Sequence, residues 1–260
     1  MRTKRLETII NMLEEQGNVE VAELSALLKV TEKTIRQDLI LLEKTGLAVR
    51  VHGGATLPSC ISDIYPIPSR RQKHFEEKKE IATQAVSLIE DGDIIILDSG
   101  STTLELAKLL DKQVIVITND PIITYTLLYN EKITLFSTGG KVRREFGSTY
   151  TGPDAIRMLN NYHANKCFIG TSTFDPQKGL MVFSSEEGEV KSAIIRASSQ
   201  TICLADYSKF NRTAFFTFAA PSDIDIIVTD NRITEQDLHT LQASGIQIMA
   251  PNSANIKSRR

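Results

Sequence analysis

The chain has 260 residues, 41% of them hydrophobic, and a formal net charge of −2 at pH 7, which is typical of a folded globular protein with a sizeable core. No apolar run reaches the roughly 18 residues of a membrane span, and the N-terminal segment turns polar at Asn11 before a secretory hydrophobic region develops, so we expect a cytoplasmic protein without membrane contact. The three cysteines, Cys60, Cys167 and Cys203, are far apart and lack a CxxC spacing, which indicates free thiols rather than disulfides or a metal site, and no cofactor is expected.

The first 45 residues have the apolar spacing of three helices. The first helix places apolar residues at i, i+3, i+4 and i+7 and ends at Gly17. The second is predicted over residues 21–28. The third begins after Thr31, whose hydroxyl makes a good N-cap, runs to about residue 45 and is stopped by Gly46. The residues expected to face inward are Leu6, Ile9, Ile10 and Leu13 in the first helix, Leu24, Leu27 and Leu28 in the second, and Ile35, Leu39 and Leu42 in the third.

Residues 47–55, LAVRVHGGA, alternate apolar with polar and end in two glycines, a pattern typical of a small two-stranded wing. Three prolines between residues 57 and 74, followed by a cluster of Arg and Lys, predict a linker. We therefore expect a small N-terminal domain over residues 1–56, a linker over 57–74 and a second domain over 75–252.

From residue 75 the pattern changes to helices that alternate with short β-branched strands. Strands are predicted at 93–97, 114–118, 133–137, 166–170, 201–205 and 225–229, and helices at 77–90, 103–110, 121–129, 154–160 and 187–198, before a final helix and strand. This alternation predicts an α/β domain whose mostly parallel sheet is covered by helices on both faces and whose ligand crevice lies at the carboxyl ends of the strands. Residues 253–260 are expected to form a disordered tail.

The outer face of the third helix carries side chains suited to reading DNA. Burial of its apolar residues would place Lys33, Thr34, Arg36 and Gln37 outward near the helix start, where a recognition helix meets base edges. Arg can pair with guanine and Gln with adenine. An ordinary solvated helix face has similar residues, but the tight preceding turn and the wing favour DNA binding.

The stretch VAELSALLKVTEKTIRQDLILLEKTGLAVRVHGGA resembles the winged helix-turn-helix of the DeoR family of bacterial sugar-operon repressors, through its T-I-R-x-D-L core and H-G-G-A ending. Gln37 departs from the family, which usually has a second Arg there. For the wing residues Arg50 and His52, contact with phosphate and simple support of the glycine turn both stay open. The resemblance implies a DNA-binding set of Thr31, Lys33, Thr34, Arg36, Gln37, Arg50 and His52 on operator double-stranded DNA.

Charge adds an expectation about assembly. Residues 1–55 contain eight Lys or Arg and eight Asp or Glu, so the segment is neutral. Because non-specific DNA affinity comes mainly from cations that neutralise phosphates, a single neutral module should bind weakly. We therefore expect a homo-oligomer that presents several recognition helices together.

Residues 98–103, DSGSTT, follow a predicted buried strand and open a helix. The free amides at a helix start and the helix dipole attract anions, and the hydroxyls could complete a phosphate cradle, although a turn of this composition is also an ordinary helix cap. The segment is similar to the D-x-G-T-T loop of the DeoR sensor domain, itself similar in fold to ribose-phosphate isomerases. Together with further matches along the chain, the resemblance implies a site for a phosphorylated sugar or polyol formed by Asp98, Ser99, Gly100, Ser101, Thr102, Thr103, Asn119, Gly139, Gly140, Thr171, Ser172, Glu187, Lys191, Asp206 and Lys209.

Roles within this set follow from charge and size. Lys209, and less directly Lys191, could neutralise a phosphate, while the carboxylates of the set could accept hydrogen bonds from sugar hydroxyls. For Asp206, pairing with Lys209 is an equal alternative. Thr171 and Ser172 suit the lining of a polyol site, whereas Asn119 and the two glycines at 139 and 140 are expected to shape the pocket.

A sugar-phosphate isomerase is the alternative to a regulator. The isomerases that resemble this fold carry G-A-D-E-x-D with two active-site aspartates, and the corresponding piece here is GTSTFD, in which Gly170 and Asp175 persist but Ser172 replaces the first aspartate. A hydroxyl of ordinary pKa cannot replace a carboxylate base. A purely architectural DNA-binding protein would need no pocket, which the many polar strand ends speak against. We therefore expect a non-enzymatic repressor of a carbohydrate operon.

Overall fold

A computed structural model describes residues 2–16, 18–44, 48–51, 53–56, 73–143 and 149–251. The chain divides into two compact units, Met1–Ser69 and Arg70–Arg260, which are described separately. Most of the predicted linker and the predicted tail lie outside the described residues, as do Cys60, His52 and the two helix-stopping glycines at 17 and 46, so these expectations stay predictions. Within the described part, no helix combines the length and apolarity that crossing a membrane requires.

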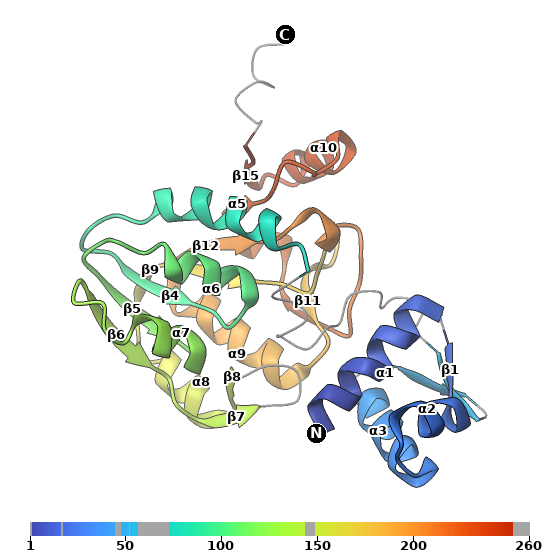
Figure 1. Ribbon diagram of the computed structural model, residues 1–260. Helices are drawn as coiled ribbons and strands as arrows, with labels where there is room; N and C mark the ends of the chain where they lie inside the picture. Colours follow the sequence, from blue (N-terminus) through green and yellow to red (C-terminus); the bar gives the residue numbers. More distant parts are fainter. Residues whose placement is uncertain are drawn as a thin grey trace. The chain divides into compact units, whose positions relative to one another are not determined.

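The N-terminal unit is a three-helix bundle with a small sheet (Figure 1). Its elements are α1 (Arg2–Gln16), β1 (Asn18–Glu20), α2 (Val21–Leu28), α3 (Glu32–Lys44), β2 (Val49–Val51) and β3 (Gly54–Thr56). The strands pair antiparallel in the order β1-β3-β2, so the predicted two-stranded wing gains a third strand from the segment between α1 and α2. The apolar residues predicted to face inward from α1 and α3 are all buried.

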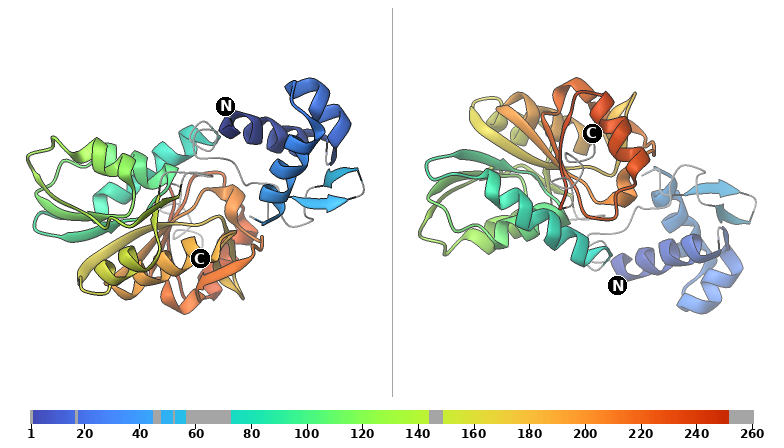
Figure 2. Two further views of the ribbon diagram at one scale, coloured as in Figure 1. Left: turned by 90° about the horizontal axis from the view of Figure 1, so that it is seen from below. Right: turned by 90° about the horizontal axis from the view of Figure 1, so that it is seen from above.

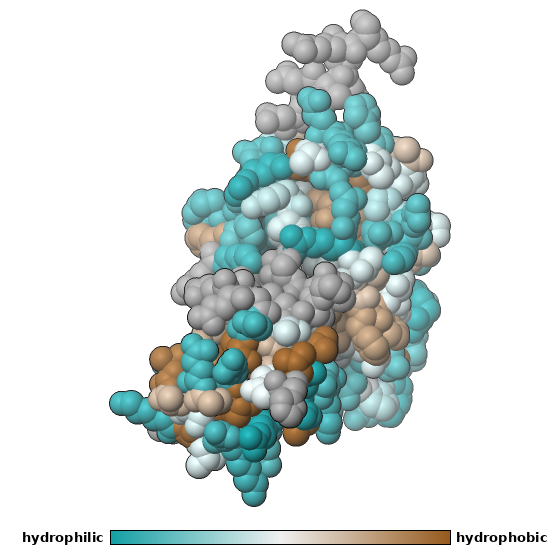
Figure 3. Space-filling view, turned by 90° about the vertical axis from the view of Figure 1, so that its right-hand side faces the viewer, coloured by the Kyte–Doolittle hydropathy of each residue, from teal (hydrophilic) through white to brown (hydrophobic). Residues whose placement is uncertain are grey.

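One core residue of this unit was wrongly predicted. Leu27 is 56% exposed and Leu28 is only half-buried, whereas Val21 and Leu24 are buried. An eight-residue helix has little more than two turns, so its buried stripe is narrow and its end turns away from the bundle. Val49 and Val51 of the wing are also exposed, and Figure 3 shows hydrophobic side chains exposed among hydrophilic ones on one face of the molecule.

The second unit is built on a seven-stranded sheet of order β15-β14-β12-β9-β4-β5-β6, in which every neighbouring pair is parallel. Its strands are β4 (Ile94–Leu97), β5 (Val114–Thr118), β6 (Ile133–Ser137), β9 (Ala164–Gly170), β12 (Ser198–Leu204), β14 (Ile226–Val228) and β15 (Gln247–Met249). From β4 the chain moves outward through β5 and β6, then returns to place β9 on the other side of β4. The sheet therefore has a topological switch point between β4 and β9, where α/β proteins commonly bind ligands.

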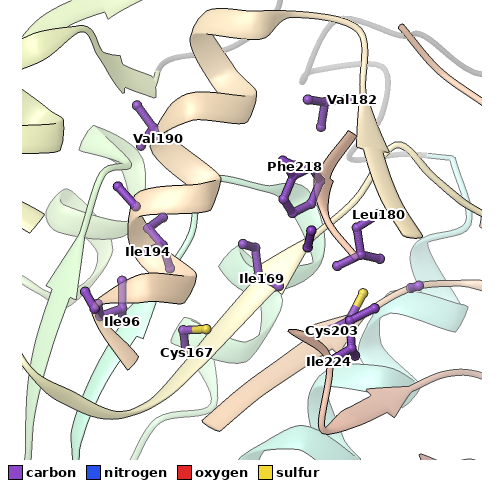
Figure 4. Packing of buried hydrophobic residues seen from close by; sticks show 14 of the residues in the cluster. Ile96, Cys167, Ile169, Leu180, Val182, Val190, Ile194, Cys203, Phe218 and Ile224 are labelled. Carbon is purple, nitrogen blue, oxygen red and sulfur yellow. The ribbon is translucent and has the colours of Figure 1, made fainter. Parts of the chain in front are cut away.

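Helices cover both faces of this sheet (Figure 2). One face packs against α5 (Phe75–Ala85), α6 (Ser101–Lys108) and α7 (Pro121–Leu127), and the other against α8 (Pro153–Leu159), α9 (Ser185–Arg196) and α10 (Glu235–Ala243). Successive strand residues alternate between the two cores, as Ile95 and Ile96 do. Val190 and Ile194 of α9 lie in the same core as Ile96 and Ile169 (Figure 4). The predicted α/β architecture is confirmed.

Several short elements were not predicted. They are the antiparallel pair β7 (Lys141–Arg143) and β8 (Thr149–Thr151), the antiparallel sheet of β10 (Thr173–Asp175), β11 (Gly179–Val182) and β13 (Phe216–Ala219), and the 3-10 turns η1 (Val86–Leu88), η2 (Tyr207–Lys209) and η3 (Pro221–Asp223). Cys167 and Cys203 are free and buried, and burial raises the pKa of these thiols to about 11 and about 12. Such thiols are unreactive at neutral pH.

Candidate functional sites

Helix α3 exposes most of the side chains that the sequence predicted to face outward. Thr31 caps the helix, because its Oγ1 accepts a hydrogen bond from the backbone N–H of Thr34 at 3.3 Å, and the two hydroxyls lie 2.9 Å apart. Lys33, Arg36 and Gln37 are exposed and Thr34 is half-buried. Four of the predicted contact residues thus lie together on the first turns of one helix.

The Arg36 guanidinium is already paired within the helix. Its Nη2 lies 2.7 Å from Oε2 of Glu32, one turn earlier, and both side chains are about half exposed. Exposed pairs at this spacing stabilise a helix by only about 0.3–0.5 kcal/mol. The pair therefore orients Arg36 in the free protein. Breaking it costs little free energy, so a stronger partner can replace Glu32.

A buried ion pair fixes α3 in the bundle. Arg5 Nε of α1 donates to Oδ2 of Asp38 at 2.5 Å, and Asp38 is only 1% exposed. Our sequence reasoning missed this pair. The signal was present, since Asp38 lies on the same i, i+3, i+4, i+7 stripe as Ile35, Leu39 and Leu42, and a carboxylate on a buried stripe needs a cationic partner.

The remaining predicted DNA contact that can be placed is Arg50, on the exposed strand β2. Its Nη1 lies 3.5 Å from Oε2 of Glu43, near the end of α3. Strand β2 and helix α3 are thereby linked through side chains at the surface. His52 lies outside the described residues.

At the switch point of the second unit, a buried ion pair joins β4 to α9. Asp98 lies directly after β4, and its Oδ2 contacts Lys191 Nζ. The same oxygen accepts a hydrogen bond from the backbone N–H of Gly170 at 3.1 Å. Lys191 also donates to the Gly170 carbonyl at 2.9 Å. Asp98 and Lys191 are 1% and 2% exposed. Burial raises the pKa of Asp98, and the Lys191 ammonium opposes that rise. The network extends to Glu187, 3.8 Å from Lys191, and from there to Arg143 at 3.3 Å.

The other oxygen of Asp98 has a different environment. Oδ1 is buried and has no hydrogen-bond partner among the described residues. A buried carboxylate oxygen without a donor is costly, so a donor from outside the protein would be stabilised there.

The loop after β4 leads directly into α6. The helix begins at Ser101, two residues before the predicted start, so Ser101, Thr102 and Thr103 form its first turn, where backbone N–H groups lack intrahelical acceptors. Gly100 is the extended N-cap, and Thr103 Oγ1 donates to its carbonyl at 3.0 Å. The Thr103 hydroxyl is therefore engaged within the loop.

Ser99 and Asn119 hold this loop against the loop that follows β5. The Ser99 N–H donates to Asn119 Oδ1 at 2.9 Å, and the Ser99 hydroxyl donates to Asp120 Oδ2 at 2.8 Å. Asp120 also caps α7 through the N–H of Ile122. The sequence reasoning missed Asp120, although an Asp directly before the Pro at the first position of a helix is a recognised cap signal.

The predicted glycines lie after β6. Gly139 and Gly140 have φ of +60° and +107°, and a Cβ at Gly140 would lie 2.9 Å from the Thr151 carbonyl oxygen. Both backbone conformations favour glycine. These residues therefore have a clear role in forming the loop.

Thr171 and Ser172 follow β9, on the other side of the switch point. The Thr171 hydroxyl lies 2.7 Å from the Thr173 carbonyl and 3.1 Å from the Met181 carbonyl, and the Ser172 N–H donates to Met181. Asp175, which resembles the second isomerase aspartate, accepts the N–H groups of the next turn through Oδ1, at 2.9 Å from residues 177 and 178. Asp175 thus caps a hairpin turn.

Asp206 and Lys209 lie after β12. Asp206 is buried and accepts the N–H and the hydroxyl of Ser208. Burial acts to raise the pKa of Asp206, but the Lys209 charge, the Ser208 hydrogen bonds and His74 together lower it. The loops after β4, β9 and β12, three neighbouring strands, therefore bring Asp98, Thr171 and Asp206 to one edge of the sheet.

Comparison with known proteins agrees with these features. Residues 5–60 match the DeoR-like helix-turn-helix domain, and residues 73–231 match the DeoR C terminal sensor domain. The chain belongs to the DeoR family. It is therefore a DNA-binding transcriptional regulator with a helix-turn-helix and a sensor domain.

Relatives of this DeoR-family protein are similar over nearly their whole length. A protein of Escherichia coli O157:H7 named "Putative aga operon transcriptional repressor" is 36% identical over 95% of this chain and 93% of its own. The transcriptional repressor GlcR of Bacillus subtilis is 33% identical over 95% of both chains, and the transcriptional regulator GolR of Listeria innocua is 32% identical over 94% and 97%.

Solved structures show weaker likeness to this DeoR-family protein. Ribose 5-phosphate isomerase A of Methanocaldococcus jannaschii has a TM-score of 0.40 at 18% identity, over 53% of this chain and 55% of its own. A Pyrococcus horikoshii OT3 translation initiation factor, eIF-2B, has a TM-score of 0.46 at 14% identity, over 87% of each chain.

Proposed function

We propose that this regulator represses a carbohydrate-utilisation operon in the cytoplasm and that a phosphorylated sugar or polyol, bound at the carboxyl edge of the parallel sheet, controls its affinity for operator DNA. The unpartnered Oδ1 of Asp98, beside the first turn of α6 at the switch point, is the observation that carries the proposal. A phosphorylated polyol offers both complementary groups, a phosphate for the helix N-terminus and a hydroxyl donor for the carboxylate. Relatives named as repressors, among them the aga operon protein, support the direction of regulation.

The buried pair of Asp98 with Lys191 refines the roles expected of these residues. Because Lys191 is engaged by Asp98 and by the Gly170 carbonyl, we assign phosphate neutralisation to Lys209, which is half-buried in the loop after β12. Lys191 then serves to hold Asp98 in place through Oδ2. Thr171 and Ser172 follow β9 at the same edge, where the Thr171 hydroxyl is engaged by the Thr173 and Met181 carbonyls.

Isomerase activity is the weaker alternative. Proton transfer between adjacent carbons needs a positioned base. In the GTSTFD segment the first carboxylate is replaced by Ser172, and Asp175 holds backbone N–H groups of its own turn. We therefore propose a site that binds sugar phosphates without turnover.

Regulation requires the effector to bind more tightly to the low-affinity arrangement than to the DNA-bound one. A coupling free energy of about 1–3 kcal/mol changes operator occupancy roughly 5- to 150-fold. We also propose that the chain acts as a homo-oligomer, since residues 1–55 have no net charge to hold one module on DNA.

Thermal unfolding of the full chain with sugar phosphates, the matching unphosphorylated sugars and inorganic phosphate tests the sensing role. A true effector at a hundredfold excess over its dissociation constant stabilises the fold by about 2.7 kcal/mol, and the unphosphorylated sugar does not. If none of the phosphorylated compounds stabilises the protein or releases it from DNA, the sensing proposal is wrong.

Substitutions then separate the two ends of the molecule. Arg36→Ala should abolish operator binding and leave effector binding intact, whereas Arg157→Ala, an exposed helical arginine paired with Asp154, is the matched control and should change neither. Lys209→Ala, or Ser101→Ala with Thr102→Ala, should leave operator binding intact but insensitive to the effector. A Lys209→Ala variant with a normal response would assign that lysine a structural role.

A further inference from the structure

Helix α5 is the first element of the second unit, and its first turns are tied to the loop that follows β14. Arg232 Nη1 lies 2.8 Å from Oε1 of Glu77, and the N–H of Asn231 donates to Oε2 of Glu80 at 3.3 Å. The Arg232 charge and His74 lower the pKa of Glu77 against the effect of its burial. The start of α5 is thus held by a loop at the carboxyl edge of the sheet.

The residue before α5 makes a second contact with this edge. The His74 ring packs edge-on against the Tyr207 ring, with centroids 5.2 Å apart and planes at 83°. The Arg232 guanidinium lies 4.2 Å from the centroid of the same Tyr207 ring. The His74 backbone has φ of +53°, a conformation that costs free energy in a residue with a side chain and that persists where its surroundings hold it.

A buried carboxylate ties Tyr207 and Arg232 together. Asp230 accepts the Tyr207 N–H at 2.8 Å through Oδ2 and the Arg232 N–H at 2.9 Å through Oδ1, and it is fully buried. Tyr207 is therefore connected to Arg232 through the Asp230 carboxylate as well as through the ring contact.

Tyr207 also belongs to the effector-site loop. It directly follows Asp206 and opens the turn η2, which ends at Lys209. The Asp206 carboxylate is held by the N–H and hydroxyl of Ser208. A ligand that draws Lys209 toward a phosphate, or donates a hydroxyl to Asp206, must act on this turn.

The α5 clamp is the name we give to the cluster of His74, Glu77, Tyr207, Asp230 and Arg232. We infer that this clamp couples effector binding at the Asp206–Lys209 turn to the residues that lead into the DNA-binding unit. The inference rests on the proposed function. Tyr207 is the central positioning residue. It directly follows Asp206 at the start of the turn, and its ring packs against His74. The clamp provides a physical connection between the effector edge and the start of α5, in place of a coupling spread evenly through the unit.

The first test measures coupling in the full chain with glucose 6-phosphate, fructose 6-phosphate, ribose 5-phosphate and glycerol 3-phosphate as probes, on a duplex selected by the wild-type protein from a random-sequence pool. At probe concentrations that saturate each protein, the operator affinity of Tyr207→Leu with and without the active probe should differ far less than the roughly 5- to 150-fold expected of wild type. Tyr207→Phe keeps the ring and should retain the response. Tyr125→Leu, a tyrosine 73% exposed on α7, is the matched control.

The second test needs no effector. Because coupling is reciprocal, operator binding alone should change hydrogen exchange in residues 204–210, and His74→Ala or Tyr207→Leu should reduce that change. Unchanged exchange there in the wild-type protein, or a full response of Tyr207→Leu to the probe, overturns the inference. If no probe binds the wild-type chain, the proposed effector is wrong, whereas the exchange experiment still decides whether the clamp is coupled to DNA binding.

Discussion

Lys191 shows how a single buried charge organises the sensor unit. Its ammonium neutralises Asp98 and donates to the Gly170 carbonyl, so it links β4, β9 and α9 at the switch point. Removing one member of a buried pair leaves the other charge without compensation, which costs more than the pair itself contributes.

We therefore expect Lys191→Met to destabilise the sensor unit by about 3–5 kcal/mol. Adding Asp98→Asn should recover part of this loss, so the double variant should be less destabilised than the sum of the two single variants. Urea unfolding measures both. Lys141→Met, which breaks an exposed pair with Glu186, should stay within about 0.5 kcal/mol of wild type and is the matched control. Additive single effects would show that Asp98 and Lys191 do not interact.

Asp206 gives a prediction for pH. The folded protein lowers its pKa from the ordinary value of 3.8, so the charged carboxylate contributes stability that is present above that value and is lost as pH falls below it. The difference in unfolding free energy between wild type and Asp206→Asn should be constant near neutral pH and shrink below about pH 3.8. Denaturation curves between pH 7 and pH 3 measure it, with Asp154→Asn of α8 as the control for loss of one exposed acid. A difference that grows on acidification would contradict the assignment.

At the scale of elements, periodic apolar patterns predicted the long helices and the parallel strands. A helix must bury one apolar stripe, and a strand in a sheet covered on both sides must bury both of its faces. The bounds of α2, β5 and β6 agree with the residues predicted. The three- and four-residue strands β7, β8, β10, β11 and β13 were missed, since so short a run carries no period and depends on partners far along the chain. The same limit applies to the sites: loop positions at strand ends were predictable, but the pairing of Asp98 with Lys191, 93 residues later, and of His74 with Tyr207 arises only from the fold.

The helix pair α1 and α3 allows a contrast between two arginines. Arg5→Met removes the partner of buried Asp38 and should destabilise the N-terminal unit by about 3 kcal/mol, whereas Arg36→Met removes only an exposed pair and should change stability by less than about 0.5 kcal/mol. At temperatures where both variants are folded, Arg36→Met should lose operator binding, because Arg36 faces outward, whereas Arg5→Met should keep it. Thermal unfolding together with DNA titration at a temperature below both transitions distinguishes the two effects. An Arg5→Met variant as stable as Arg36→Met would show that the buried pair does not secure α3.

For the whole molecule, the neutral charge of residues 1–55 leads us to expect that affinity depends on how many modules engage DNA together. Linking binding modules can raise affinity by about 10²–10⁴ without any new contact, so removing one half-site from the selected operator should weaken binding by a factor in that range. Each module should still contribute its own phosphate contacts. Lys33→Ala should therefore reduce the magnitude of the slope of log affinity against log salt by about 1 for each copy of Lys33 that touches phosphate. Binding of half-operators and full operators across a salt series measures both quantities on the same preparations. Equal affinity for half and full operators, in a protein that sediments as a monomer, would mean that one neutral module suffices and that the oligomer is not needed for recognition.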